Sequence, residues 1–242
     1  MQKESRVKKT VLNAKINLIC YFASFITAFF TRKILLDNLG AEFIGFTGTV
    51  GSLLSFLNLA ELGIGTAIGY VLYKPIADGD KFKINEVISV LGYLYRIIGL
   101  AILSLGIIGS LFLPLIFSDT EIPLGVIYCG FYAYLAASMI GYFVNYRAAL
   151  LSADQRNYVV TGYFQITTTC KVILQMILAI YFGSFYIYFA IELIGGIINA
   201  KILNWKINKT YPWLKSEIKQ GKQIFKNTPK SPSILSKYSP IK

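Results

Sequence analysis

Histidine is missing from all 242 residues of the chain, and cysteine occurs only 3 times. Without an imidazole, the chain cannot build a histidine-based catalytic triad, zinc site or proton relay. Cys20, Cys129 and Cys170 lie far apart within apolar stretches, so their spacing predicts neither a metal site nor a disulfide framework. We expect all three to be buried and inert, and we expect no metal and no cofactor.

Charged residues are also scarce, at 15% of the chain, whereas 55% of the residues are hydrophobic. This balance is typical of a helical membrane protein with several spans and not of a soluble domain. The 24 lysines and arginines outnumber the 12 acids and cluster beside the apolar stretches. Such clusters indicate membrane topology, so we expect contact with membrane lipid and no nucleic-acid partner. We predict six spans, at residues 15–36, 43–73, 87–117, 124–152, 157–182 and 184–208.

The charges of the connecting segments predict how these spans are oriented. The N-terminal segment up to Lys15, the first residue of the first span, holds five basic residues, and Lys74, Lys81 and Lys83 lie between the second span and the third. The connection at 118–123 has two acids and no base. By the positive-inside rule, both termini lie in the cytoplasm, which agrees with an even number of spans.

The chain divides into a membrane part and a polar tail. Leu214, Ile218, Gly221 and Phe225 share one helical face with lysines on the others, which predicts an amphipathic helix at the membrane surface. The final residues are rich in proline, serine and lysine, a composition typical of disorder. The predicted parts are a six-helix transmembrane lobe at 1–208, a cytoplasmic amphipathic segment at 209–226 and a disordered tail at 227–242.

Five of the six apolar stretches contain an ionisable side chain: Glu61, Arg96, Arg147, Lys171 and Glu192. A charge near the bilayer centre costs about 2.5–3.5 kcal/mol on insertion scales, so a helix that only anchors the chain has no reason to carry one. Charges in membrane spans usually face the interior of a bundle or a water-filled cavity. We therefore predict a hydrated path for an ion or a charged substrate.

Polar residues at helical spacing extend several of these charged positions into stripes. Small and polar stripes also mediate ordinary helix packing in membranes, so this alternative stays open. The charges in the second, fifth and sixth spans favour the hydrated cavity. Its predicted polar lining is Asn58, Gln165, Thr168, Gln175 and Asn199.

The sign of the charges narrows the predicted cargo. Arg96, Lys171 and Arg147 are candidate substrate-binding residues, although Arg147 is close enough to a helix end to snorkel. Glu61 and Glu192 are candidates for coupling or gating, and ion pairs between these acids and the bases are the structural alternative. Complete pairing leaves one cation over. A cavity with surplus positive charge favours an anionic ligand such as a phosphate or pyrophosphate.

Three local motifs carry a family resemblance. They are DNLGAEFIG at 37–45, AELGIG at 60–65 and LYKPIADGD at 72–80. With the basic start, they make residues 6–225 resemble the amino-terminal half of a polysaccharide or O-antigen flippase of the Wzx type. These carriers belong to the multidrug/oligosaccharidyl-lipid/polysaccharide exporter superfamily, whose fold is MATE-like. The resemblance implies an all-α integral membrane protein whose roughly six helices form one lobe of such a transporter.

The resemblance also implies a function. Wzx-type carriers lie in the bacterial inner membrane and translocate undecaprenyl-pyrophosphate-linked oligosaccharides for surface polysaccharide biosynthesis, including the O-antigen of lipopolysaccharide. Relatives have about twelve to fourteen spans in two lobes, so we expect a truncated or split form and a second lobe from another chain. The alternatives are half of a MATE-type multidrug exporter and an inactive remnant. A membrane enzyme of polysaccharide assembly is disfavoured because histidine is missing, and we expect a non-enzyme.

Overall fold

The structure, a computed structural model, describes residues 6–58 and 64–227, and within these ranges it is helical with no strand. A 3₁₀ turn at Asn145–Arg147 links the sixth helix to the seventh. The helices are α1 (Arg6–Leu39), α2 (Ala41–Asn58), α3 (Ile64–Asp78), α4 (Lys81–Ser110), α5 (Leu113–Ile116), α6 (Leu124–Val144), α7 (Ala148–Ala153), α8 (Asn157–Phe182), α9 (Phe185–Thr210) and α10 (Ile218–Asn227).

Five of the described helical segments are long and apolar enough to cross a membrane. They are Thr10–Leu39, Lys81–Ser110, Leu124–Ala153, Asn157–Phe182 and Phe185–Thr210. The all-α membrane class is thereby supported, and five of the six predicted spans have a matching helix. The remaining predicted span, 43–73, falls on α2 and α3, and residues 59–63 between them lie outside the described part of the chain.

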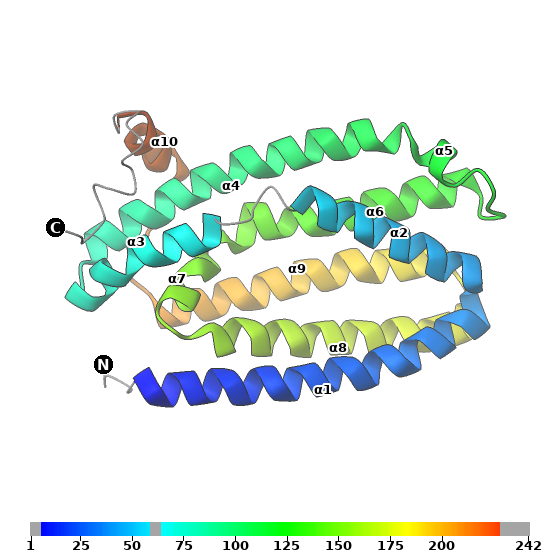
Figure 1. The fold of residues 1–242 in the computed structure, drawn as a ribbon, viewed down its shortest axis with the longest axis horizontal. Helices are drawn as coiled ribbons and strands as arrows, with labels where there is room; N and C mark the ends of the chain where they lie inside the picture. Colours follow the sequence, from blue (N-terminus) through cyan, green and yellow to red (C-terminus); the bar gives the residue numbers. More distant parts are fainter. Residues whose placement is uncertain (1–5, 59–63, 228–242) are drawn as a thin grey trace.

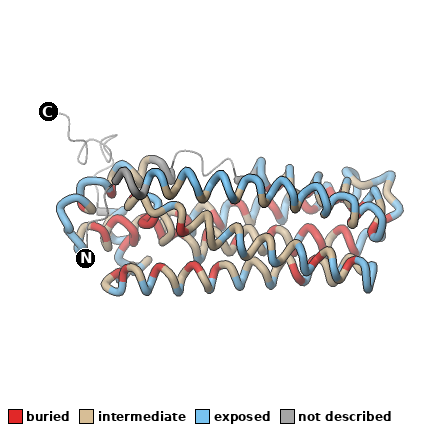
Figure 2. Tube along the Cα trace, turned by 90° about the horizontal axis from the view of Figure 1, so that it is seen from below, coloured by how far each residue is buried: buried red, intermediate tan, exposed pale blue. Residues whose placement is uncertain are grey.

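The long helices form a row. Along it α1 packs on α8, α8 on α9, α9 on α6 and α6 on α4. Helix α2 contacts α1, α6 and α4, and α3 contacts α4 and α7, so these two helices cover one side of the row. The start of α1 and the end of α9 lie at the same end of the bundle (Figure 1). Figure 2 shows buried residues along the inner sides of an elongated bundle.

Glycines in the left-handed region form the sharp turns between neighbouring helices. Gly183 ends α8 with φ +54°, and its N–H donates to the carbonyl of Ala179 at 2.9 Å. Gly40, with φ +87°, separates α1 from α2 in the same way. Because residues with a Cβ rarely adopt this conformation, these two positions favour glycine.

Aromatic rings form the part of the core where α2, α6 and α9 meet. Phe43, Phe46 and Phe189 are fully buried, and the Phe46 and Phe189 rings lie 5.9 Å apart between centroids. Gly130 of α6 makes room for them, because a Cβ there would lie 2.5 Å from Cζ of Phe189. From the sequence we expect most aromatic side chains to face lipid or the membrane interface, and this cluster is an exception.

Two other expectations need correction. Cys129 and Cys170 are exposed and Cys20 is half-buried, so the cysteines do not belong to the packed core. The amphipathic helix begins only at Ile218, and Leu214 lies in the preceding turn.

Helix α10 packs across α4. A Cβ added to Gly221 would lie 2.1 Å from the carbonyl oxygen of Ser89, and the rings of Tyr93 and Phe225 lie 5.7 Å apart. The helix therefore approaches α4 through its glycine face, and its place at the membrane surface stays a prediction.

Candidate functional site

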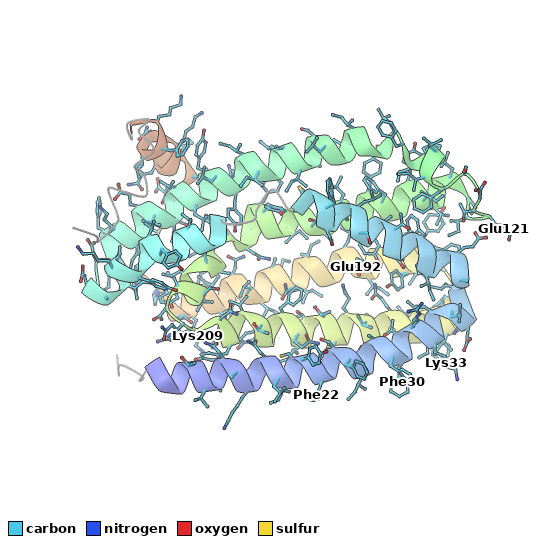
Figure 3. All side chains as sticks on the ribbon, in the orientation of Figure 1. Phe22, Phe30, Lys33, Glu121, Glu192 and Lys209 are labelled. Atoms are coloured by element: carbon cyan, nitrogen blue, oxygen red, sulfur yellow. The ribbon has the colours of Figure 1, made fainter. Side chains whose placement is uncertain are left out.

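An ion pair joins α8 to α9 within their apolar lengths. Nζ of Lys171 lies 2.5 Å from Oε1 of Glu192, and the two side chains are only 17% and 15% exposed. From the lengths of the helices, Lys171 lies about 20 Å from the Asn157 end of α8 and Glu192 about 10 Å from the start of α9. Figure 3 shows Glu192 within the length of the bundle, whereas Lys33, Glu121 and Lys209 lie toward its ends.

A buried amide completes this network. Nε2 of Gln175 donates to Oε2 of Glu192 at 3.1 Å and to the carbonyl of Tyr188 at 3.3 Å, and Gln175 is only 1% exposed. The aliphatic part of Lys171 lies over Gly195, where an added Cβ would be 2.6 Å from Cδ of the lysine. The carboxylate is thus satisfied on both oxygens, which offsets the cost of holding it away from water. We call Lys171, Gln175 and Glu192 the charge network.

The two predicted arginines lie outside the charge network. Arg96 is exposed on α4, and among the described residues no ion pair or hydrogen bond involves its guanidinium. Arg147 is half-buried in the 3₁₀ turn, and its Nη2 donates to the carbonyl of Leu214 at 3.3 Å. Among the described residues, the structure therefore brings one of the three candidate substrate-binding cations, Lys171, to the candidate coupling acid Glu192.

The residues of the predicted polar lining also contact different neighbours and do not form one group. Gln165 turns toward α1, where its Oε1 accepts a hydrogen bond from Oγ of Ser24 at 3.0 Å. Asn199 accepts from the neighbouring Thr167 at 2.9 Å and not from the predicted Thr168, which is half-buried. Of the four predicted lining residues whose side chains the structure describes, Gln175 alone is part of the charge network.

Two candidates lie in or beside residues 59–63, which the structure does not describe. Glu61 lies outside the described residues, and Asn58 is the last residue of α2, with its side chain not described. The predicted coupling role of Glu61 therefore stays a prediction, as does the predicted place of Asn58 in the cavity lining.

A separate cavity of about 710 Å³ lies between α3, α4, α6 and α7. The described residues that line it include no Lys, Arg, Asp or Glu, so this cavity does not contain the predicted charged path. Five of the lining residues are tyrosines, which the sequence analysis does not single out because they come from three helices and a turn. They are Tyr70, Tyr73, Tyr95, Tyr142 and Tyr146.

Polar clusters fix both ends of the bundle. At one end the hydroxyl of Thr120 and the N–H of Glu121 donate to Glu42, and these hydrogen bonds hold the pKa of that carboxyl below its usual value. At the other end the hydroxyl of Tyr211 donates to Asp154 at 2.8 Å. Burial and the nearby Asp154 carboxylate raise the pKa of the Tyr211 hydroxyl, which keeps it protonated as a donor.

Comparisons of the chain with family models, with curated proteins and with solved structures found no match.

Proposed function

We propose that this chain forms one lobe of a flippase that moves an undecaprenyl-pyrophosphate-linked oligosaccharide across the bacterial inner membrane. The observation that supports this proposal is the Lys171–Glu192 pair within two apolar helices. A helix pair that only packs has cheaper ways to associate, such as the small residues and amide hydrogen bonds common in membranes. Ionisable groups retained at this depth are typical of transport paths.

The charge network suggests how binding and movement are coupled. Among the described residues, Lys171 has one carboxylate partner, Glu192. An incoming pyrophosphate competes for this ammonium group because it carries more negative charge than a single carboxylate. Glu192 then loses its counter-ion in a poorly hydrated place, which raises its affinity for a proton or another cation. Substrate binding at Lys171 is thereby linked to cation uptake at Glu192.

The remaining parts of the proposal concern the assembly. The exposed Arg96 contacts the pyrophosphate only when a second lobe closes over α4, and that lobe comes from another chain or from further sequence. Arg147 contributes from the turn after α6. Helices α2 and α3 together make the sixth crossing. The basic residues at the end of the bundle that contains Asp80 and Thr210 orient both termini toward the cytoplasm.

A reconstituted transport assay tests the proposal. Vesicles containing the assembled protein and a polyprenyl-pyrophosphate-linked glycan are treated with a glycosidase that cannot cross the membrane, and protection of the glycan is followed with time. The variant K171M/E192L replaces the pair with apolar side chains of similar size, so the fold is expected to persist. We expect this variant to flip the glycan at least about tenfold more slowly, because its site no longer holds the pyrophosphate charge.

The matched control is K33M, which removes a lysine from the exposed end of α1 and should leave transport unchanged. Folding of each variant is checked by its thermal unfolding midpoint in the same vesicles. If K171M/E192L folds and transports at the rate of the unchanged protein, the charge network has no role in transport and the proposal fails.

A further inference from the structure

The described residues that line the cavity between α3, α4, α6 and α7 are all uncharged. Its lining residues are tyrosines, small residues, two serines and one asparagine. Tyr95, Tyr142 and Tyr146 are buried at its base, and Tyr70 and Tyr73 of α3 are exposed. Figure 1 shows these four helices converging at the end of the bundle where α1 begins. The rings of Tyr95 and Tyr142 lie 5.9 Å apart between centroids and are tilted by 43°, so two aromatic rings adjoin at the base.

A buried hydrogen-bond acceptor adds an independent observation. Oδ1 of Asn145 is buried, and within the described part of the chain it has no hydrogen-bond partner. Asn145 lines the cavity and begins the 3₁₀ turn that interrupts α6 and α7. Buried polar atoms are almost always paired, and those that are not often mark a site where a ligand or water binds. A ligand with a hydroxyl or N–H group would supply the missing donor for Oδ1 of Asn145.

We propose that this cavity binds a neutral sugar unit. Sugar rings present C–H groups on their faces and hydroxyls at their edges, which suits flat aromatic walls with a few fixed polar atoms. A cavity of about 710 Å³ is within the usual size range for small-molecule sites. The hydroxyls of the sugar donate to Oδ1 of Asn145 and exchange hydrogen bonds with Ser152 and the tyrosines at the opening.

The lining argues against charged ligands. No lysine or arginine is among the described lining residues, so a phosphate or pyrophosphate would have no counter-charge there. Tyrosine faces attract organic cations, but no lining carboxylate among the described residues would neutralise one. A neutral, hydroxyl-rich ligand fits both the tyrosines and the unpaired acceptor.

The identity of the sugar as part of a lipid-linked glycan rests on the proposed function, whereas its binding in the cavity does not. The cavity and the charge network lie on different helices, since α8 and α9 contribute no lining residue. The two sites would hold different parts of one substrate, with the glycan between α3 and α6 and the pyrophosphate at Lys171. They can therefore be tested separately.

The test measures saccharide binding directly. The assembled protein is placed in lipid nanodiscs, which avoids detergents with sugar headgroups, and saturation-transfer NMR is recorded with chitobiose, maltose and lactose. We expect transfer from tyrosine ring protons to sugar ring protons for at least one of them. Inorganic pyrophosphate and tetramethylammonium are added as competitors, and we expect neither to reduce the signal.

Two variants locate the binding. N145L removes the buried acceptor and Y73L removes a half-exposed ring, and each should weaken saccharide binding about tenfold, the loss expected for one good contact. Because Oδ1 of Asn145 has no described partner, N145L should not lower the thermal unfolding midpoint. A purely structural asparagine would behave in the opposite way. The matched control Y181L removes an exposed tyrosine at the end of α8, outside the cavity, and should leave binding unchanged.

The outcomes test the sugar site and the flippase proposal separately. No transfer to any of the saccharides, transfer unaffected by N145L and Y73L, or displacement by pyrophosphate or tetramethylammonium overturns the sugar site. If saccharides bind but K171M/E192L transports normally, the sugar site stands and the flippase proposal fails. If transport depends on the charge network but no saccharide binds, the flippase proposal stands without this site.

Discussion

Helix α9 packs through two faces that are held together by different forces. Toward α8 it presents Glu192 and Asn199, which are engaged by Lys171 and Thr167 through an ion pair and a hydrogen bond. Toward α6 and α2 it presents the fully buried ring of Phe189, which contacts other rings and a glycine. Glu192 and Phe189 are three residues apart, about 60° around the helix, so the polar face and the aromatic face adjoin on α9.

The difference between these faces separates packing from function. In a bilayer, rings and small residues associate through close contact alone, and nothing more is needed to hold two helices together. The polar face carries charges that packing does not require and that cost free energy to bury. We therefore expect changes on the aromatic face to alter stability alone and changes on the polar face to alter transport as well as stability.

The largest expected loss of stability comes from Phe189→Ala. Phe189 is 1% exposed and its ring contacts those of Phe43 and Phe46, so truncation leaves a cavity that the rigid neighbours cannot fill. We expect a loss of about 3–5 kcal/mol, as for large aromatic residues in packed cores. Equilibrium unfolding in bicelles measures it, with Phe182→Ala at the lipid-exposed end of α8 as control. Equal losses for both variants would mean that the aromatic face has no special role.

Next in size is the effect of breaking the ion pair from one side. Lys171→Met leaves Glu192 beside Gln175 without its counter-charge, so we expect a loss of about 3 kcal/mol. The variant K171M/E192L should recover most of this loss, because no charge is then left unpaired. The same unfolding measurement gives the coupling between the two positions. If the single and double variants were equally unstable, the pair would not be the source of the effect.

The charge network could be predicted only in part from the sequence. Residues Gln165 and Lys171 lie on one apparent stripe of α8, but six residues correspond to about 120° of rotation around the helix. That rotation turns Gln165 toward Ser24 of α1 while Lys171 faces Glu192 of α9. A polar stripe this wide serves two neighbouring helices, and the sequence does not say which neighbours they are.

The positions of the helices follow from the sequence more accurately than the contacts between them. The predicted span 157–182 coincides with α8, because hydropathy and a terminal glycine both mark its end. The predicted span 124–152 includes the break at Asn145, which no proline or glycine pair announces. Hydropathy and helical spacing do not predict the tyrosine cavity, because Tyr70, Tyr95 and Tyr142 come from three different helices.

We expect a smaller loss of stability from Gly130→Ala, where α6 packs against the aromatic face of α9. The new Cβ would lie 2.5 Å from Cζ of Phe189 and 2.6 Å from Cζ of Phe46, and the packed rings leave little room to move. Overpacking of this kind costs about 1–3 kcal/mol. Gly125→Ala on the same helix is the matched control, because nothing lies within 4 Å of a Cβ there. Transport by any Gly130→Ala protein that remains folded should stay normal, whereas a selective loss of transport would contradict the division between the two faces.

The smallest expected loss of stability comes from removing the hydrogen bond between Thr167 and Asn199 on the polar face. Thr167→Val removes the hydroxyl that donates to Oδ1 of Asn199 at 2.9 Å while keeping the shape of the side chain. Hydrogen bonds between membrane helices are worth about 0.6 kcal/mol on average, so we expect a loss of that size. Thr27→Val is the matched control, since within the described part of the chain the Thr27 hydroxyl donates to the Ala23 carbonyl of its own helix and to no other helix. A loss of stability as large as that from Lys171→Met would show that neutral polar contacts, and not the ion pair, hold α9 to α8.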